Sequence, residues 1–414
     1  MQSLPSDTCV LRPYRYSLST FTPRTSLVTS SSSNNPLNSS LSSFSLVGLR
    51  RESSLLLFGD RIWNRNPFVC SQTKRNDFGL LVPPLRCEPS SNGNSIQGER
   101  SLMQWIELIG EALSTAFPVW VALGCVLGLL RPASYAWVQP RWTVLGITLT
   151  MLGMGMTLTL DDLRGALAMP KELISGFVLQ YSVMPISGFL VSKLLNLPSY
   201  YAAGLILVGC CPGGMHQLVA KILCLSRGNV ALSVLMTATS TMAAVIMTPF
   251  LTAKLAGQFV AVDAAGLLMS TLQIVLLPVL GGAFLNQYFH GLVRFVSPFM
   301  PPIAVGTVAV LCGHAIAQSS SAIRISGQQV VLAAALLHAS GFFFGYVLAR
   351  LLGIDIASSR TISIEVGMQN SVLGVVLASQ HFGNPLTAVP CAVSSVCHSI
   401  FGSVLAGIWR QSKD

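Results

Sequence analysis

The sequence has little charge, and the charge it has is placed unevenly. Only 10% of the 414 residues are Asp, Glu, Lys or Arg, whereas 51% are hydrophobic and the mean hydropathy is +0.62. This balance excludes an ordinary soluble domain and is typical of a polytopic helical membrane protein. Inside the apolar stretches Glu365 is the only carboxylate, and no Lys or Arg lies in the middle of a stretch.

Several binding and catalytic signatures are also missing. No basic stripe with interleaved aromatic residues is present, so the net charge of +10 does not indicate nucleic-acid binding. The ten cysteines form no C-x-x-C pair and no Cys/His spacing suited to zinc. G-x-S-x-G, Walker A and H-E-x-x-H patterns are lacking, and Asp161-Asp162 has no second acidic cluster with which to bind magnesium. We therefore predict neither an enzyme nor an organic cofactor, and no obligate protein partner is evident.

Residues 1–90 differ in composition from the rest of the chain. They are rich in serine, and up to Arg86 they hold ten Lys or Arg against four Asp or Glu. Such a segment cannot bury enough apolar surface to fold alone. Its composition, without a continuous apolar run near the start, is typical of a plastid transit peptide; a mitochondrial presequence and a disordered cytosolic tail are the alternatives. We expect this leader at 1–90 and a membrane domain at 100–414.

The membrane domain contains ten apolar segments, each bounded by charged residues, Pro, Gly or Asn. A helix of about 20 residues crosses a bilayer, so each segment predicts one transmembrane helix. An even number of helices places both termini on one side, and the bias of Lys and Arg predicts that this side is the stroma if the membrane is the plastid envelope. The predicted spans are 116–130, 142–160, 173–195, 200–223, 229–253, 265–288, 299–317, 328–352, 356–381 and 386–409.

The ten segments predict two inverted five-helix repeats, at about 100–255 and 256–414. Pro118 in the first span corresponds to Pro278 in the sixth, and Gly213 in the fourth corresponds to Gly367 in the ninth. Each of these glycines interrupts its span. A repeat with an odd number of helices reverses in the membrane, and interrupted helices at matching positions indicate the midplane site of a secondary transporter.

Glu365 lies beside the second of these interruptions. A carboxylate at membrane depth is costly unless it is paired or faces a cavity. Because no basic side chain lies mid-span, we predict that a cation from solution is its partner; packing against another helix is the alternative.

Oxygen donors for a sodium ion are available near this carboxylate. Ser233 and Thr237 are four residues apart, so they lie on one helix face and present two hydroxyls. The remaining candidates are the side chains of Gln180, Glu365 and Gln369 and the backbone carbonyls of Val366 and Met368. His398 and Ser399 are candidates for hydrogen bonds to a substrate, whereas His314 and His338 are interpreted as packing residues.

Three blocks of the chain resemble the bile acid:sodium symporter family, and within it the plant plastid sodium/metabolite cotransporters. They are Cys-Pro-Gly-Gly at 211–214, Arg-Gly-Asn-Val-Ala-Leu-Ser-Val at 227–234 and Glu-Val-Gly-Met-Gln-Asn-Ser at 365–371. The resemblance covers residues from about 100 to the end. It implies ten helices in a core and a panel domain, crossing of the interrupted fourth and ninth helices, and sodium-driven uptake of organic anions by alternating access.

The resemblance also implies roles for single residues. Glu365 would bridge two sodium sites. The first site would include Ser233 and Thr237; the second would include Gln180, Gln369 and the carbonyls of Val366 and Met368; the substrate-binding residues would be Gly214, Asn370, His398 and Ser399.

One segment departs from the family pattern. After Cys-Pro-Gly-Gly, members of the family usually continue with a small or polar pair and then with Ser-Asn, whose side chains complete the first sodium site. This chain has Met-His-Gln-Leu-Val at 215–219 instead. The sequence predicts a sodium-coupled importer of a small organic anion, a monocarboxylate or 2-oxo acid, in the plastid inner envelope membrane. A proton-coupled organic anion carrier and a non-transporting variant, caused by the altered 215–226 segment, are the alternatives.

Overall fold

The computed structural model describes residues 110, 112–114, 116–159, 169–214, 219, 222, 223 and 226–412. The predicted leader, Asp161-Asp162 and most of the altered 215–226 segment lie outside the described residues. Within the described part the secondary structure is helical apart from one isolated antiparallel bridge between Gly213 and Gln369. The prediction of an all-α chain is confirmed for this part.

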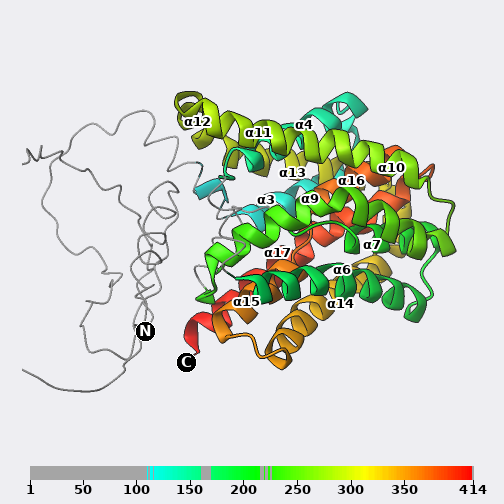
Figure 1. The fold of residues 1–414 in the computed structure, drawn as a ribbon. Coiled ribbons are helices and arrows are strands. Elements are labelled where there is room, and N and C mark those ends of the chain that lie inside the picture. The colour runs from blue at the N-terminus through cyan, green and yellow to red at the C-terminus, as the bar shows by residue number, and fades with distance from the viewer. Residues whose placement is uncertain are drawn as a thin grey trace, which may run out of the picture. The chain divides into compact units, whose positions relative to one another are not determined.

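The helices follow the predicted spans in order (Figure 1). They are α3 (Phe117–Leu130), α4 (Pro140–Gly155), α6 (Pro170–Leu194), α7 (Ser199–Gly209), α9 (Val230–Leu255), α10 (Ala264–Thr271), α11 (Leu277–Tyr288), α12 (His290–Val296), α13 (Met300–Gln318), α14 (Ser320–Leu351), α15 (Ile356–Gly367), α16 (Ser371–His381) and α17 (Ala388–Gln411). Short turns of 3₁₀ helix lie at Pro132–Tyr135, Ala256–Gln258, Ser297–Phe299 and Pro385–Thr387, and a π-helical turn lies at Leu272–Leu276.

Six helical runs in the described residues are long and apolar enough to cross a membrane. The helices α3, α7 and α16 are apolar but shorter. The predicted total of ten spans in two repeats therefore stays a prediction. The six runs are Pro170–Leu194, Val230–Gln258, Ala264–Tyr288, His290–Gln318, Ser320–Leu351 and Pro385–Gln411.

Asn and Asp side chains mark the starts of four helices. Asn229, Asp263, Asp355 and Asn370 precede α9, α10, α15 and α16, and each accepts a hydrogen bond from the backbone N–H three residues further on. These bonds satisfy N–H groups that have no partner within the helix. The starts of these four helices therefore depend on residues that are close together in the sequence.

The predicted start of the eighth span, at residue 328, is wrong. The helix α14 begins at Ser320, because polar side chains in its first turns find partners on neighbouring helices. Arg324 Nη2 donates to the carbonyl of Leu129 at 2.9 Å, and Gln329 Nε2 donates to that of Leu195 at 2.7 Å. Hydropathy alone does not detect a helix segment whose polar groups are satisfied in this way.

The seventh predicted span, 299–317, corresponds to α13, which runs from Met300 to Gln318 after the short helix α12 and a 3₁₀ turn. The sixth span is not a regular α-helix throughout: its π-helical turn ends directly before Leu277-Pro278. Pro278 has no N–H to donate to the preceding turn, which accounts for the local widening of the helix.

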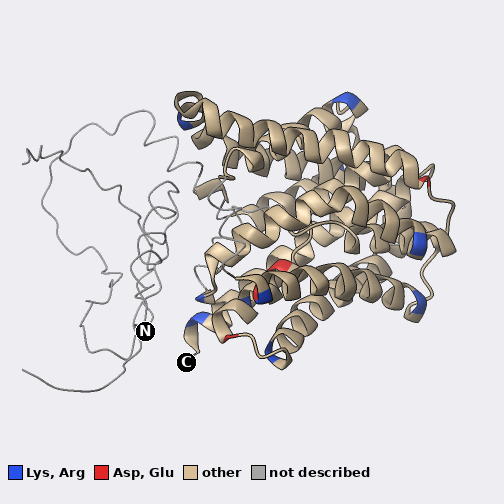
Figure 2. Ribbon diagram, in the orientation of Figure 1, with Lys and Arg blue, Asp and Glu red and all other residues tan. Residues whose placement is uncertain are grey.

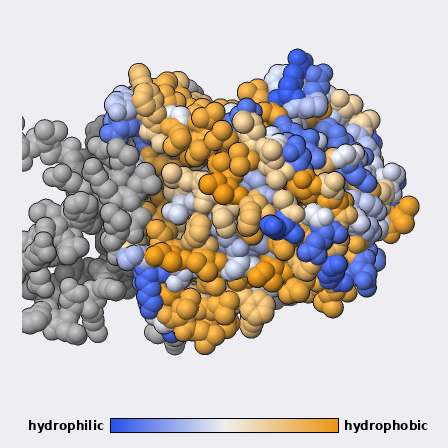
Figure 3. Space-filling view, turned by 45° about the vertical axis from the view of Figure 1, so that its right-hand side comes forward, coloured by the Kyte–Doolittle hydropathy of each residue, from blue (hydrophilic) through white to orange (hydrophobic). Residues whose placement is uncertain are grey.

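The outer surface of the membrane domain is largely apolar. Figure 2 shows most Lys and Arg positions near the ends of the helices, and Figure 3 shows broad hydrophobic areas bordered by hydrophilic ones. Large side chains such as Ile246, Phe343 and Leu190 are 66%, 60% and 57% exposed. Apolar exposure of this extent is expected where lipid tails are the solvent.

The helix packing places two broken helices inside the domain. The helix α14 packs against α6, α15 and α17, while α3 packs against α13 and α4 against α11. The end of α7, the end of α15 and the start of α16 are buried among these helices.

Candidate functional site

Two breaks in the helices lie within the buried interior. The helix α7 ends at Gly209 and is followed by non-helical residues up to Gly214; we call 210–214 the first break. The helix α15 ends at Gly367 and α16 begins at Ser371; we call 368–370 the second break. Both interruptions lie where the glycines of the sequence predicted them.

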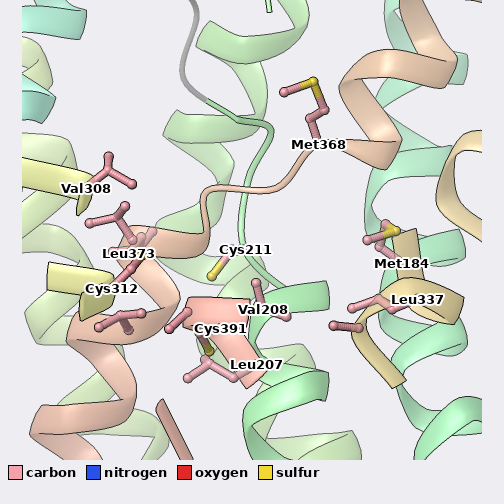
Figure 4. Close-up of a cluster of buried hydrophobic side chains, with 14 of the residues drawn as sticks. Met184, Leu207, Val208, Cys211, Val308, Cys312, Leu337, Met368, Leu373 and Cys391 are labelled. Atoms are coloured by element: carbon pink, nitrogen blue, oxygen red, sulfur yellow. The ribbon is translucent and has the colours of Figure 1, made fainter. Parts of the chain in front are cut away.

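The two breaks pair with each other through their backbones. The N–H of Gly214 donates to the carbonyl of Met368 at 2.7 Å, and that of Asn370 donates to the carbonyl of Pro212 at 2.9 Å. Figure 4 shows the segments through Cys211 and Met368 beside each other above a cluster of apolar side chains. The pairing satisfies backbone groups that the helix ends leave free, as a membrane interior requires.

Glu365 lies in the last turn of α15 and is 1% exposed. The hydroxyl of Ser233 donates to its Oε1, and the hydroxyl of Thr237 lies 3.1 Å from both carboxylate oxygens. Both hydroxyl residues come from one face of α9 and are buried. The structure thus brings together the three residues that the sequence assigned to the first sodium site.

The first break approaches the same carboxylate closely. A Cβ atom added at Gly213 would lie 2.8 Å from Oε2 of Glu365, which is closer than carbon and oxygen atoms can approach without displacement. Gly213 is therefore a position where the absence of a side chain lets the backbone of the first break reach the carboxylate.

A second group of polar atoms surrounds Gln180 on α6, which is 2% exposed. Its Nε2 donates to Oε1 of Gln369 at 3.0 Å and to the carbonyl of Cys211 at 3.3 Å. Nε2 of Gln369 in turn donates to the carbonyl of Val366 at 2.7 Å. The Oε1 of Gln180 is buried and has no hydrogen-bond partner, which leaves one acceptor free in this group.

The donor atoms fit a hard monovalent cation. They are one carboxylate, hydroxyls, amide oxygens and backbone carbonyls, which are the ligand types that alkali and alkaline-earth ions prefer. In the described residues no group of three or more His, Cys, Asp and Glu could hold a metal ion. The free Gln180 Oε1 and the single negative charge of Glu365 therefore suit an ion of low charge better than a transition metal.

Asn370, a predicted substrate residue, has a structural role at the start of α16. Its Oδ1 accepts a hydrogen bond from the N–H of Leu373 at 3.1 Å, and its Nδ2 lies 4.0 Å from the sulfur of Met151 on α4. Gly214 contributes its backbone to the pairing of the breaks. Both residues lie where the breaks meet.

His398 and Ser399, on α17, are placed differently from Asn370. The hydroxyl of Ser399 donates to the carbonyl of Ser395 in its own helix at 2.7 Å, so it is already satisfied. The ring of His398 is 4% exposed and faces the ring of His338 on α14, with 5.2 Å between the ring centroids. Within the described chain no hydrogen bond joins either residue to Asn370.

Sequence reasoning missed three side chains at the site. Met151 and Met154 of α4 contact polar groups of the site, since the sulfur of Met154 lies 3.9 Å from the hydroxyl of Thr241. The hydroxyl of Ser371, in the first turn of α16, is buried without a hydrogen-bond partner. The methionines carry no signal in an apolar span, whereas Ser371 could have been found from its place directly after the second break.

The chain is similar to known proteins over most of its length. Residues 144–326 match the model of the Sodium Bile acid symporter family. The chain is 71% identical over 346 residues, 84% of each chain, to the "Probable sodium/metabolite cotransporter BASS1, chloroplastic" of Arabidopsis thaliana. It is 66% identical over 341 residues, 80% of this chain and 84% of the relative, to the protein of the same description from Oryza sativa subsp. japonica.

A bacterial relative extends the likeness. The "Uncharacterized sodium-dependent transporter YocS" of Bacillus subtilis (strain 168) is 36% identical over 310 residues, which are 75% of this chain and 95% of the relative. Identity of this extent over most of both chains establishes membership: the chain belongs to the bile acid:sodium symporter family.

Proposed function

We propose that the protein uses a sodium gradient to import a small organic anion across the inner envelope membrane of the plastid. The observation that carries the proposal is the buried carboxylate of Glu365, held by hydroxyls of α9 beside two paired helix breaks. The leader composition and the chloroplastic names of the plant relatives support the location.

Sodium is the ion that best matches the two polar groups. Burying an unpaired carboxylate costs roughly several kcal/mol of free energy, and a bound cation offsets that cost. Glu365, Ser233 and Thr237 would hold one ion. Gln180, Gln369 and the carbonyls of Val366 and Met368 would join Glu365 in holding a second one.

The start of α16 suits a negatively charged group of the substrate. The N-terminus of a helix carries about half a positive charge, which attracts an anion. The unpartnered hydroxyl of Ser371 lies in this first turn, next to Asn370. A partial charge of this size balances one carboxylate better than two, which favours a monocarboxylate such as a 2-oxo acid. Gly214, His398 and Ser399 are the other residues that we predict to contact the substrate.

Transport requires that the site open to each side in turn. We propose ten helices in two inverted repeats, with the broken helices in a core domain and α4 in a panel domain that moves against it. The contacts of Met151 with Asn370 and of Met154 with Thr241 would then form and break during the cycle. Thioether side chains suit such a surface because they are flexible and repack easily.

Uptake by proteoliposomes tests the proposal. The purified protein is reconstituted, and uptake of labelled pyruvate, other monocarboxylates and a dicarboxylate is compared under inward gradients of Na⁺, K⁺ or H⁺. We expect uptake of at least one monocarboxylate under the sodium gradient and none under the potassium gradient. Uptake driven by the proton gradient alone would identify a proton-coupled carrier, and no uptake under any gradient would identify a non-transporting variant.

A further inference from the structure

One face of α14 supports the end of the broken helix α15. Gly341 and Gly345 lie one turn apart on this face, and small residues at this spacing let two membrane helices approach closely. A Cβ added at Gly341 would lie 3.2 Å from the Cα of Gly367, and one at Gly345 would lie 3.1 Å from the Cα of Ser363. The last turns of α15 therefore rest directly on the backbone of α14.

His338 lies on the same face, one turn before Gly341, and is fully buried. Its Nδ1 is 2.8 Å from the carbonyl oxygen of Gly367, the last residue of α15. A carbonyl oxygen only accepts hydrogen bonds, so Nδ1 is the nitrogen that carries the proton. In the neutral ring Nε2 then holds a lone pair, and Nε2 is buried without a hydrogen-bond partner.

Among the described residues, His338 is the donor that is seen at the carbonyl of Gly367. In a continuous helix the N–H of Ser371 would donate to it, but that N–H donates to the carbonyl of Gln369 at 2.9 Å. His338 therefore substitutes for the backbone donor that the second break removes, and it fixes the orientation of the peptide group that follows Gly367.

The carbonyls on either side of Gly367 belong to the group that we assign to the second sodium ion. The carbonyl of Val366 accepts from Gln369, and that of Met368 accepts from the N–H of Gly214. The Gly367 peptide links the two residues that carry these carbonyls, so its orientation helps to set where the carbonyls lie relative to each other. We propose that His338, through Nδ1, is a positioning residue of the cation site, an inference that rests on the proposed function.

If His338 only packs, the variants that keep sodium binding will differ from those that keep it if His338 positions the Gly367 carbonyl. The side-chain amide of asparagine reaches the place of Nδ1, whereas that of glutamine reaches the place of Nε2. His338→Asn therefore keeps a donor for the Gly367 carbonyl, His338→Gln moves the donor away from it, and His338→Leu removes the donor but fills the space. His314→Asn, on α13, serves as a matched control away from the breaks.

The test measures the midpoint of thermal unfolding of the purified protein against NaCl concentration, with choline chloride holding the ionic strength constant. We expect His338→Asn and His314→Asn to keep the native half-saturating sodium concentration within about twofold. In His338→Gln and His338→Leu this concentration should rise about tenfold or more, because a buried carbonyl loses its partner. If His338→Leu does not fold, the comparison of His338→Gln with His338→Asn still shows whether a donor at the place of Nδ1 is needed for sodium binding.

Two results would overturn the assignment. Native sodium dependence in both His338→Gln and His338→Leu would show that His338 only packs, and an equal loss in His338→Asn and His338→Leu would show that Nδ1 is not the atom that matters. A native protein whose unfolding does not respond to sodium at all would refute the proposed function, and this inference with it. The two failures are thus distinguishable.

Discussion

Replacing Glu365 by glutamine removes one charge from the site and leaves its shape. Glutamine retains an oxygen that can accept the hydroxyl hydrogen bonds now made by Ser233 and Thr237. Two unit charges about 4 Å apart at an effective dielectric constant of about 20 attract each other by about 4 kcal/mol. Loss of this attraction weakens sodium binding about 1,000-fold, since about 1.4 kcal/mol corresponds to a factor of ten.

Thermal unfolding in the presence of sodium reports this loss directly. At a sodium concentration of about 100 times the dissociation constant, binding adds about 2.7 kcal/mol to the free energy of unfolding of the native protein. At the same concentration Glu365→Gln should gain almost nothing, and its sodium-driven uptake in proteoliposomes should fall to background. Without sodium the variant should be at least as stable as the native protein, because no charge is then buried in a membrane interior.

Glu172→Gln is the matched control for this prediction. Glu172 lies in the first turn of α6, away from the breaks, and its replacement should leave the sodium response unchanged. If Glu365→Gln retained the native rise of the unfolding midpoint with sodium, or the native flux, the assignment of Glu365 as the ion-binding carboxylate would be wrong.

Three further changes test parts of the same site. Thr237→Val keeps the branched shape but removes the hydroxyl that lies 3.1 Å from both oxygens of Glu365. The half-saturating sodium concentration for uptake should therefore rise about ten- to 150-fold. An unchanged concentration would show that this hydroxyl does not bind the ion. Gly213→Ala places a methyl group 2.8 Å from that carboxylate. Overpacking of this kind costs about 1–3 kcal/mol, so the half-saturating sodium concentration should rise about five- to 150-fold. Circular dichroism should show that the helix content stays native. Gln180→Leu removes the hydrogen bond with Gln369. The Hill coefficient of uptake with respect to sodium should then fall from about two towards one. A coefficient that stays near two would show that the second ion binds elsewhere.

The order of the helices could be read from the sequence because it depends on local properties. Apolar length, Asn and Asp caps and glycine interruptions act over a few residues, and most helices lie within a few positions of the predicted spans. The boundary at Ser320 could not be predicted in this way. It depends on Arg324 reaching a carbonyl at the end of α3, which lies 195 residues earlier in the chain.

In the candidate site, too, some residues could be predicted from the sequence and others could not. The resemblance to the family, rather than composition or spacing, grouped Ser233 and Thr237 with Glu365. Glu365 itself could be predicted from the sequence, because a lone carboxylate at membrane depth is costly enough to indicate a function. The role of His338 could not, since a histidine in an apolar span has the same sequence signal whether it packs or binds. Ser399 was predicted for the substrate, yet its hydroxyl is satisfied by its own helix.

The amino-acid sequence alone indicates a helical membrane chain in which two helices break at glycines, the second break lying beside a lone carboxylate. Those properties follow from composition and from backbone preferences of single residues. Two features could be seen only in the folded chain: Gly213 pairs with Gln369 across the two breaks, and α14 supplies a donor for the carbonyl of Gly367. These contacts join residues far apart in the chain, and hydrogen bonds of this kind depend on the relative position and orientation of whole helices.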